Sequence, residues 1–145
     1  MKLEHVLQRK GATVQTIRPD ATVADVVARL AEHNIGALVV SEDGSTVVGI
    51  VSERDVVRQL AESGAETLTA SVDSIMTPMV TCAPPSATTA SLMGVMTESR
   101  VRHVPVLDAD ENLVGIVSIG DVVKSRLNEL QDERDALVEY VNVGR

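Results

Sequence analysis

Apolar residues fall along this chain in two alternating patterns, which predict short strands and amphipathic helices. Runs of branched aliphatic residues bounded by turn formers, such as ALVV at 37–40 and VVGIVS at 47–52, are typical of buried strands. Apolar residues at helical spacing predict a helix capped by Thr22. A short extended segment at 14–17 precedes this helix, and a second helix begins at Ser52. The predicted order is therefore strand, helix, strand, strand, helix.

The same pattern occurs a second time at an offset of 66 residues. GIVSERDVVR at 49–58 returns as GIVSIGDVVK at 115–124. The second copy likewise has an extended segment at 80–83, a helix capped by Thr88 and a strand VPVL at 104–107. Self-similarity at one fixed offset indicates two copies of one fold. Because each copy spans only about 50 residues, a size at which a lone core is marginal, we expect the copies to pack on each other.

The chain divides around these copies into three segments. We expect the first repeat with the N-terminal segment at 1–66, the second repeat with its preceding linker at 67–126, and a helical tail at 127–145. The end of the linker, SVDSIMTP at 71–78, predicts one helical turn that stops before its proline. Apolar residues of the last helix recur at steps of four and three, once Arg134 is counted, at Val123, Leu127, Leu130, Leu137 and Val141. This stripe either lies on the chain's own domain or contacts a partner.

The 145 residues carry a net charge of -8 and include one Tyr but no Phe or Trp. The core must therefore be built from branched aliphatic residues, which suits strands buried under helices in an α/β (α+β) fold. The acidic balance and the lack of a basic run argue against a nucleic-acid or anionic membrane surface. No segment is apolar enough for a signal peptide or a membrane span, so we expect a soluble, cytoplasmic protein. The single cysteine, Cys82, lacks companions for an internal disulfide or a metal site.

The main candidate binding residues lie in G-I-V-S-x-x-D, the motif that both copies share. The glycine permits an unusual backbone angle or a close approach, and the serine stands where the strand becomes a helix. Unpaired backbone N–H groups at that helix start, together with the serine hydroxyl, favour a phosphate. The aspartate three residues later supplies an acceptor for sugar hydroxyls, as in dinucleotide sites. The two motifs therefore suggest nucleotide binding.

A plainer interpretation stays open, because Ser-x-x-Asp also resembles a capping box that only starts a helix. Duplication does not decide between the two, since a repeated fold repeats its caps. The placement of cations favours a ligand. Six of the thirteen basic residues follow the motifs or precede the strand VPVL, namely Arg54, Arg58, Arg100, Arg102, Lys124 and Arg126.

The motifs GIVSERD, GIVSIGD, IMTP and RVRHVPVLD, in this tandem order, resemble a pair of CBS domains, also called a Bateman module. The resemblance covers about Thr13 to Arg126, as in the stand-alone CBS-pair proteins of prokaryotes. It implies two βαββα repeats packed around a pseudo-two-fold axis, with an adenosyl ligand in one or both of two clefts. The motifs are particularly similar to members that bind adenine nucleotides such as AMP or NAD. The sequence does not choose among AMP, ADP, ATP, NAD(H) and S-adenosylmethionine.

The resemblance also implies three sets of binding residues. Ribose or phosphate would meet the hydroxyls and carboxylates of the two motifs, at Ser52, Asp55, Ser118 and Asp121. Phosphate would contact basic side chains, at Arg54, Arg102 and His103. Adenine would rest against backbone and small side chains of the early strands, in the neighbourhoods of Thr16, Ala37, Leu38, Cys82, Val104 and Pro105.

The two copies differ where phosphate is expected. Copy one carries Arg54 where copy two has Gly120, and copy two carries Arg102 and His103 where copy one has Gly36 and Ala37. The clefts should therefore differ in affinity or ligand, and Gly120 leaves room for a larger diphosphate group.

Two functions from different classes follow. The first is a non-enzymatic sensor that binds an adenine nucleotide and changes its shape or surface for an unidentified regulated partner protein. The second is a structural module whose clefts stay empty and whose faces and tail assemble homodimers or bind a client. The resemblance makes a homodimer an expectation under both. We expect no enzyme activity, catalytic cofactor or metal, because no nucleophilic arrangement accompanies His103.

Overall fold

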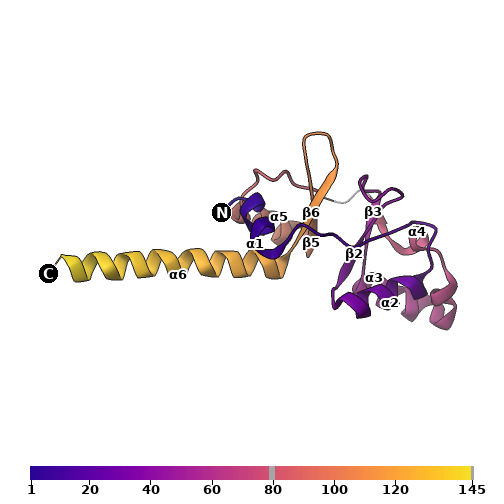
Figure 1. Cartoon of the computed structure of the whole chain (residues 1–145). Helices are drawn as coiled ribbons and strands as arrows, with labels where there is room; N and C mark the ends of the chain where they lie inside the picture. The colour runs from indigo at the N-terminus through magenta and orange to yellow at the C-terminus, as the bar shows by residue number, and fades with distance from the viewer. Residues whose placement is uncertain (79–80, 145) are drawn as a thin grey trace.

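The computed structural model describes residues 1–78 and 81–144 and folds them into two lobes, one for each copy (Figure 1). Both lobes combine helices and strands in an α+β fold, with the elements in the predicted order. Copy one contains β1 (Thr16–Ile17), α2 (Val23–His33), β2 (Ala37–Val40), β3 (Gly49–Ser52) and α3 (Glu53–Ser63). Copy two contains α5 (Thr89–Ser99), β5 (His103–Leu107), β6 (Leu113–Ser118) and α6 (Ile119–Val143).

Each copy builds its sheet around an antiparallel hairpin. β2 pairs with β3, and β5 pairs with β6 so that His103 lies opposite Ser118. β1 adds to β2 in parallel, and Ala83 forms the corresponding parallel bridge to Val106. The extended segment predicted at 80–83 is represented by this bridge, and its Val80 lies outside the described residues.

The hairpin turns are held by aspartates, as their composition predicts. Asp43 Oδ1 accepts the backbone N–H groups of Thr46 at 2.7 Å and Ser45 at 2.8 Å. These hydrogen bonds lower the pKa of Asp43 to about 2. In the second hairpin, Asp108 accepts two backbone N–H groups in the same manner, each at 2.9 Å.

The segment that precedes copy one packs against copy two. It forms α1 (Leu3–Lys10), whose Leu3 N–H donates to the Ala87 carbonyl at 2.8 Å. Leu3 and Leu7 lie in the core of copy two, beside residues such as Met96. The N-terminal segment and the first repeat are therefore neighbours in the sequence but not in this core.

The linker that precedes copy two packs, in turn, against copy one. It forms η1 (Gly64–Thr69), α4 (Val72–Ile75) and β4 (Thr77–Pro78), and the predicted helical turn before the proline is α4. β4 extends the sheet of copy one to the order β1-β2-β3-β4. Val72 N–H donates to the Ala21 carbonyl at 2.8 Å, which repeats the contact of Leu3 in the other lobe. This reciprocal crossing fits a pseudo-two-fold relation between the copies.

Each lobe is stabilised by its own core of aliphatic side chains. The core of copy one includes Leu38 and Val51, and the core of copy two includes Val104 and Val117, all 0% exposed. Each core joins its own hairpin to its helices and to the segment that crosses over. The crossing segments therefore bind the two copies to each other.

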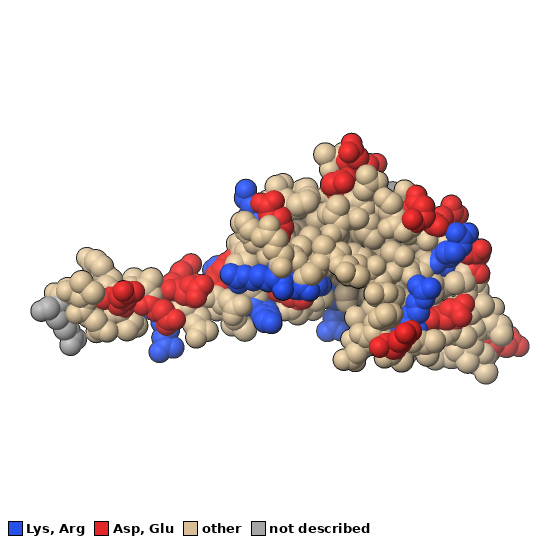
Figure 2. All heavy atoms as spheres, in the orientation of Figure 1, with Lys and Arg blue, Asp and Glu red and all other residues tan. Residues whose placement is uncertain are grey.

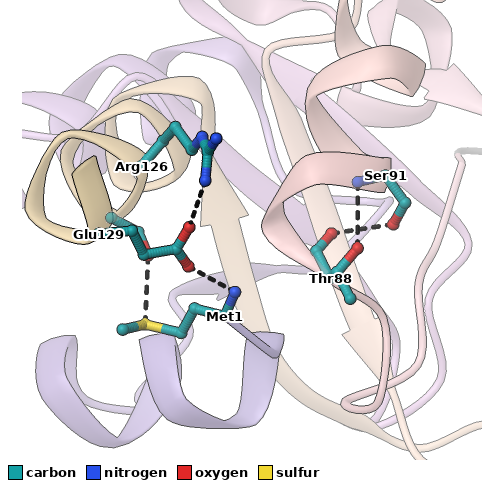
Figure 3. A network of polar contacts seen from close by, with 6 residues as sticks. Met1, Thr88, Ser91, Arg126 and Glu129 are labelled. Atoms are coloured by element: carbon teal, nitrogen blue, oxygen red, sulfur yellow. Dashed lines mark hydrogen bonds and ion pairs between the residues drawn. The ribbon is translucent and has the colours of Figure 1, made fainter. Parts of the chain in front are cut away.

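The second half of α6 projects away from both lobes (Figure 1). The first half packs on copy two through the buried residues Val122 and Ser125. Glu129 accepts hydrogen bonds from the Met1 amino group and from the Arg126 guanidinium, which lower the pKa of Glu129 (Figure 3). Every residue from Gln131 to Gly144 is exposed, so the apolar stripe of the tail does not lie on the chain's own domain. Within the described ranges, no helix has the combined length and apolar character that a membrane crossing requires.

Candidate functional site

The two copies enclose a cleft of about 780 Å³. Copy one contributes the end of β3 and the first turns of α3, from Ile50 to Arg58. Copy two contributes the segment at 99–103, which joins α5 to β5, and the start of α6. Small-molecule pockets typically measure about 300–1,000 Å³, so this cleft has the size of a ligand site.

Ser52 and Asp55 line the cleft at the N-terminus of α3. Ser52 caps the helix, because its Oγ accepts the Asp55 N–H at 3.3 Å. Asp55 Oδ2 accepts the Ser52 N–H at 2.8 Å and the Ser52 hydroxyl at 3.0 Å, so the capping box is present. Both bonds to the carboxylate use Oδ2. Within the described part of the chain, Asp55 Oδ1 therefore remains available as an acceptor, and the capping role does not exclude a ligand role.

Four arginines line the same cleft. Arg54 and Arg58 come from α3, and Arg100 and Arg102 come from the segment before β5. All four are exposed, and none of them forms an ion pair among the described residues. Their guanidinium groups are therefore available to an anion.

The remaining two cations of the predicted cluster lie elsewhere. Lys124 lines a hollow on the outer face of α6, and Arg126 pairs with Glu129 at 2.9 Å. Both therefore differ from the four arginines, which face the space between the copies.

His103 lies where the two copies meet. A Cβ built on Gly36 would be 3.6 Å from His103 Cε1 and 3.4 Å from Glu53 Oε1. Burial lowers the pKa of His103, the charges of Lys10 and Arg102 lower it further, and two carboxylates oppose this shift. The imidazole is therefore mainly neutral at pH 7 and offers one N–H donor. His103 of copy two therefore lies against Gly36 of copy one, at a distance that would be an ordinary van der Waals contact for an added Cβ.

In the second motif, the aspartate binds a lysine from α1. Ser118 caps α6 and lines the cleft, but Asp121 does not. Lys10 Nζ donates to Asp121 Oδ2 at 2.6 Å and to the Ile116 carbonyl at 2.9 Å. Ser118 N–H donates to the same Oδ2 at 2.8 Å. Burial acts to raise the pKa of Asp121, but the hydrogen bonds from Lys10 and Ser118 outweigh it and lower that pKa.

The residues expected around adenine do not line the cleft. Leu38 and Val104 are fully buried in the two cores, and Ala37 and Pro105 are buried beside them in the strands. Thr16 and Cys82 are half-buried, and burial raises the pKa of the Cys82 thiol. Gly120 lines the outer hollow of α6 instead. Of these residues, Ala37 pairs with the cleft-lining Ser52 in the hairpin of copy one.

Several lining residues were not among those predicted for the cleft. Apolar surface comes from Ile50, Val57, Val101 and Ile119, and hydroxyls come from Thr77, Thr81 and Ser99. Val57 and Ile119 lie within a few positions of the repeated motifs, so the repeat could have predicted that they line the cleft. Lys10 had no such signal, because its contact with Asp121 joins residues 111 positions apart.

The comparisons with known proteins agree with this architecture. A family model for the CBS domain matches residues 11–62 and 72–128, which together make up most of the chain. The chain belongs to the CBS-domain family. The two matches correspond to the two repeats of this CBS pair, and the second match begins at α4, within the crossing linker. Among the described residues, no group of three or more His, Cys, Asp or Glu side chains is arranged to hold a metal ion.

Relatives of this CBS pair occur in plants and prokaryotes. A mitochondrial CBS domain-containing protein of Arabidopsis thaliana is 37% identical over 130 residues, which cover 86% of this chain and 62% of that relative. The chain thus spans less than two thirds of that protein. The crystal structure of a CBS-domain protein from Agrobacterium tumefaciens has a TM-score of 0.82 and 43% identity, covering 87% of this chain and 99% of that one. A CBS domain protein from Pyrobaculum aerophilum, solved in complex with AMP, has a TM-score of 0.74 and 25% identity, covering 83% and 89%.

Proposed function

We propose that this CBS pair is a non-catalytic sensor that binds an adenine nucleotide in the cleft between its copies. The observation that carries the proposal is the convergence, on one cavity of about 780 Å³, of the Asp55 Oδ1 oxygen and four arginines that form no ion pair among the described residues. The AMP complex of the Pyrobaculum protein supports an adenine nucleotide as the ligand class.

The sugar of the nucleotide is held by the first motif. Asp55 Oδ1 accepts hydrogen bonds from the ribose hydroxyls, while Oδ2 keeps its bonds to Ser52. A carboxylate acceptor is suited to a vicinal diol, because both hydroxyls can donate to it. The capping box fixes the carboxylate before the ligand arrives, which reduces the entropy lost on binding.

The phosphate is held by the arginines. Arg54 and Arg58 approach it from copy one, and Arg100 and Arg102 approach it from copy two. Charge-assisted hydrogen bonds between guanidinium and phosphate are the strong interactions in such a site. His103, mainly neutral at pH 7, contributes an N–H donor rather than a charge.

Sensing follows from the composition of the cleft. A nucleotide that contacts Asp55 in one copy and Arg102 in the other favours the relative position of the copies in which both reach it. A ligand shifts a conformational equilibrium only by the difference between its affinities for the two states. A regulated partner protein would respond to that shift.

Calorimetric titration of the full chain tests the proposal. AMP, ATP and NAD should each be tried, with adenosine as the ligand that lacks phosphate and GMP as the ligand with another base. We expect saturable binding of an adenine nucleotide, weakened at least about tenfold for adenosine, since each charge-assisted bond contributes about 1.5–3 kcal/mol. The nucleotide should be recovered unchanged. Absence of binding by every adenine nucleotide, or its conversion to product, would contradict the proposal.

The second motif gives a separate prediction, because Lys10 competes with ribose for Asp121. Replacing Lys10 with methionine removes the ammonium group and keeps most of the aliphatic chain. The family resemblance implies a second cleft with its ribose site at Asp121, and we expect nucleotide binding there to tighten about fivefold, the equivalent of about 1 kcal/mol for a partly exposed ion pair. Binding at Asp55 should not change. Arg9→Met is the matched control, since Arg9 is the exposed neighbour of Lys10 in α1. If the wild type and Lys10→Met bind the second nucleotide with equal affinity, Lys10 does not compete with ribose for Asp121.

A further inference from the structure

The outer face of α6 carries an apolar stripe that nothing in the described chain covers. Its members, here called the α6 stripe, are Val123, Leu127, Leu130, Leu137 and Val141. Leu127, Leu137 and Val141 are 61%, 66% and 53% exposed. Figure 2 shows the projecting end of α6 as uncharged surface interrupted mostly by acidic side chains. The distal part of the stripe lies outside the region that matches the CBS domain, which ends at residue 128.

We propose that the α6 stripe binds the α6 stripe of a second copy of this chain, as an antiparallel two-helix coiled coil. The stripe follows alternating steps of four and three residues when Arg134 is included, which is the spacing of a coiled-coil seam. The helix has 25 residues and is about 37 Å long, so the seam extends over several helical turns. Because a two-fold contact is self-complementary, one such stripe on each chain is sufficient to close a dimer.

The charges of α6 select the antiparallel orientation. The first half carries Lys124 and Arg126 beside the stripe, whereas the second half carries Asp132, Glu133 and Asp135. A parallel pair would place the two acidic halves side by side. Asp121 and Glu129 balance these two cations within the first half, so the net negative charge of the helix lies in its second half. An antiparallel pair places Lys124 and Arg126 of each helix beside the acidic half of the other, which favours this orientation.

One register pairs Val123, Leu127, Leu130 and Leu137 with α6 of the second copy, while Val141 lies beyond the start of that helix. With Leu127 opposite Leu130 of the second copy, heptad geometry places Arg126 beside Glu133 of that copy. The same register places Leu137 over Gly120 of the second copy. Gly120 lies on the exposed face of α6 with Val123 and Leu127, and among the described residues only Ser118 Oγ lies within 4 Å of a Cβ built there. The surface beside Gly120 can therefore accommodate the leucine side chain.

Arg134 is a charged residue within the apolar stripe, and this register determines which residue of the second copy it faces. It lies opposite Val123 of the second copy, near the edge of the paired segment. Its long aliphatic stem can cover that valine while its guanidinium stays in water. A single charged residue within a seam also disfavours other registers, in which it would face a leucine at the centre.

The oligomeric state of the full chain tests the stripe. Light scattering across a dilution series should show a dimer for the wild type, and Leu137→Asp should raise the dimer dissociation constant at least about tenfold. Ala136→Asp is the matched control, because Ala136 is also exposed on α6 but lies off the stripe. Urea unfolding of both variants verifies that the fold is kept. A wild type that stays monomeric, or a dimer that Leu137→Asp leaves intact, would overturn the proposal.

A charge exchange tests the orientation. Glu133→Arg places two arginines together at each end of the antiparallel pair, so it should weaken the dimer about tenfold. Adding Arg126→Glu re-forms the pairs with reversed sign and should restore the dissociation constant to within about threefold of the wild type. A double variant as weak as Glu133→Arg alone would rule out the antiparallel register. None of these residues belongs to the nucleotide cleft, so failure of nucleotide binding would leave this test unaffected.

Discussion

Asp55→Asn is expected to weaken binding of AMP about 10- to 100-fold. The amide oxygen of asparagine can still accept the Ser52 N–H, so the cap of α3 is kept in part. The replacement removes the negative charge and puts an NH2 donor in place of Oδ1, the oxygen that the ribose hydroxyls would use. Loss of a hydrogen bond to a charged group costs about 1.5–3 kcal/mol, which corresponds to this range of affinity. Calorimetry with AMP measures the effect.

Asp25→Asn is the control for this experiment. Asp25 forms the same capping box with Thr22 at the start of α2, where its Oδ2 accepts the Thr22 N–H at 3.1 Å. It is exposed and does not line the cleft. Both variants lose the same charge and the same kind of cap, so their stabilities should fall by similar amounts. Only Asp55→Asn should lose nucleotide affinity, and an equal loss in both variants would refute a ribose contact at Asp55.

Gly49→Ala is expected to lower the free energy of unfolding by about 1–3 kcal/mol, the usual cost of adding a methyl group to a filled space. A Cβ at this position would lie 2.7 Å from Met76 Sδ and 2.8 Å from the Thr77 carbonyl oxygen. The carbonyl belongs to β4, which pairs with β3, so the backbone of the crossing linker must move. Chemical denaturation of the full chain measures the change.

Alanine substitutions at two other glycines are expected to change the free energy of unfolding by different amounts. A Cβ on Gly115 would lie 2.6 Å from the methyl carbons of Leu7, which are the ends of a side chain and can turn aside. Gly115→Ala should therefore cost less than Gly49→Ala. A Cβ on Gly94 meets no atom of the described residues within 4 Å, and Gly94 is inside α5, so Gly94→Ala should raise stability by about 0.5–1 kcal/mol. The opposite ranking of these variants would contradict the role given to the crossing segments.

Local patterns in the sequence predicted the elements because each depends on nearby residues. Thr22, Ser52, Thr88 and Ser118 were expected to start helices, and each of them is an N-cap in the structure (Figure 3 shows Thr88 with Ser91). The repeat also predicted that the copies would pack together. It did not reveal that α1 would cross to copy two, because this choice depends on which core Leu3 and Leu7 fill.

The candidate site was predictable to the extent that it follows the repeated motif. Ser52, Asp55 and Ser118 line the cleft because the end of a strand and the start of a helix meet there. Asp121 occupies the equivalent position but faces Lys10, a contact that arises only after α1 has crossed over. Leu38 and Val104 were expected near adenine, and their side chains are 0% exposed in the two cores, so the neighbourhood that each would offer to adenine stays a prediction.

The crystal structure of the full chain with AMP is the most direct test of a nucleotide cleft between the copies. We expect the nucleotide in that cleft, with ribose hydroxyls within about 3 Å of Asp55 Oδ1 and the phosphate against arginines from both copies. Density for AMP outside the cleft, or an AMP whose ribose does not reach Asp55, would contradict this account.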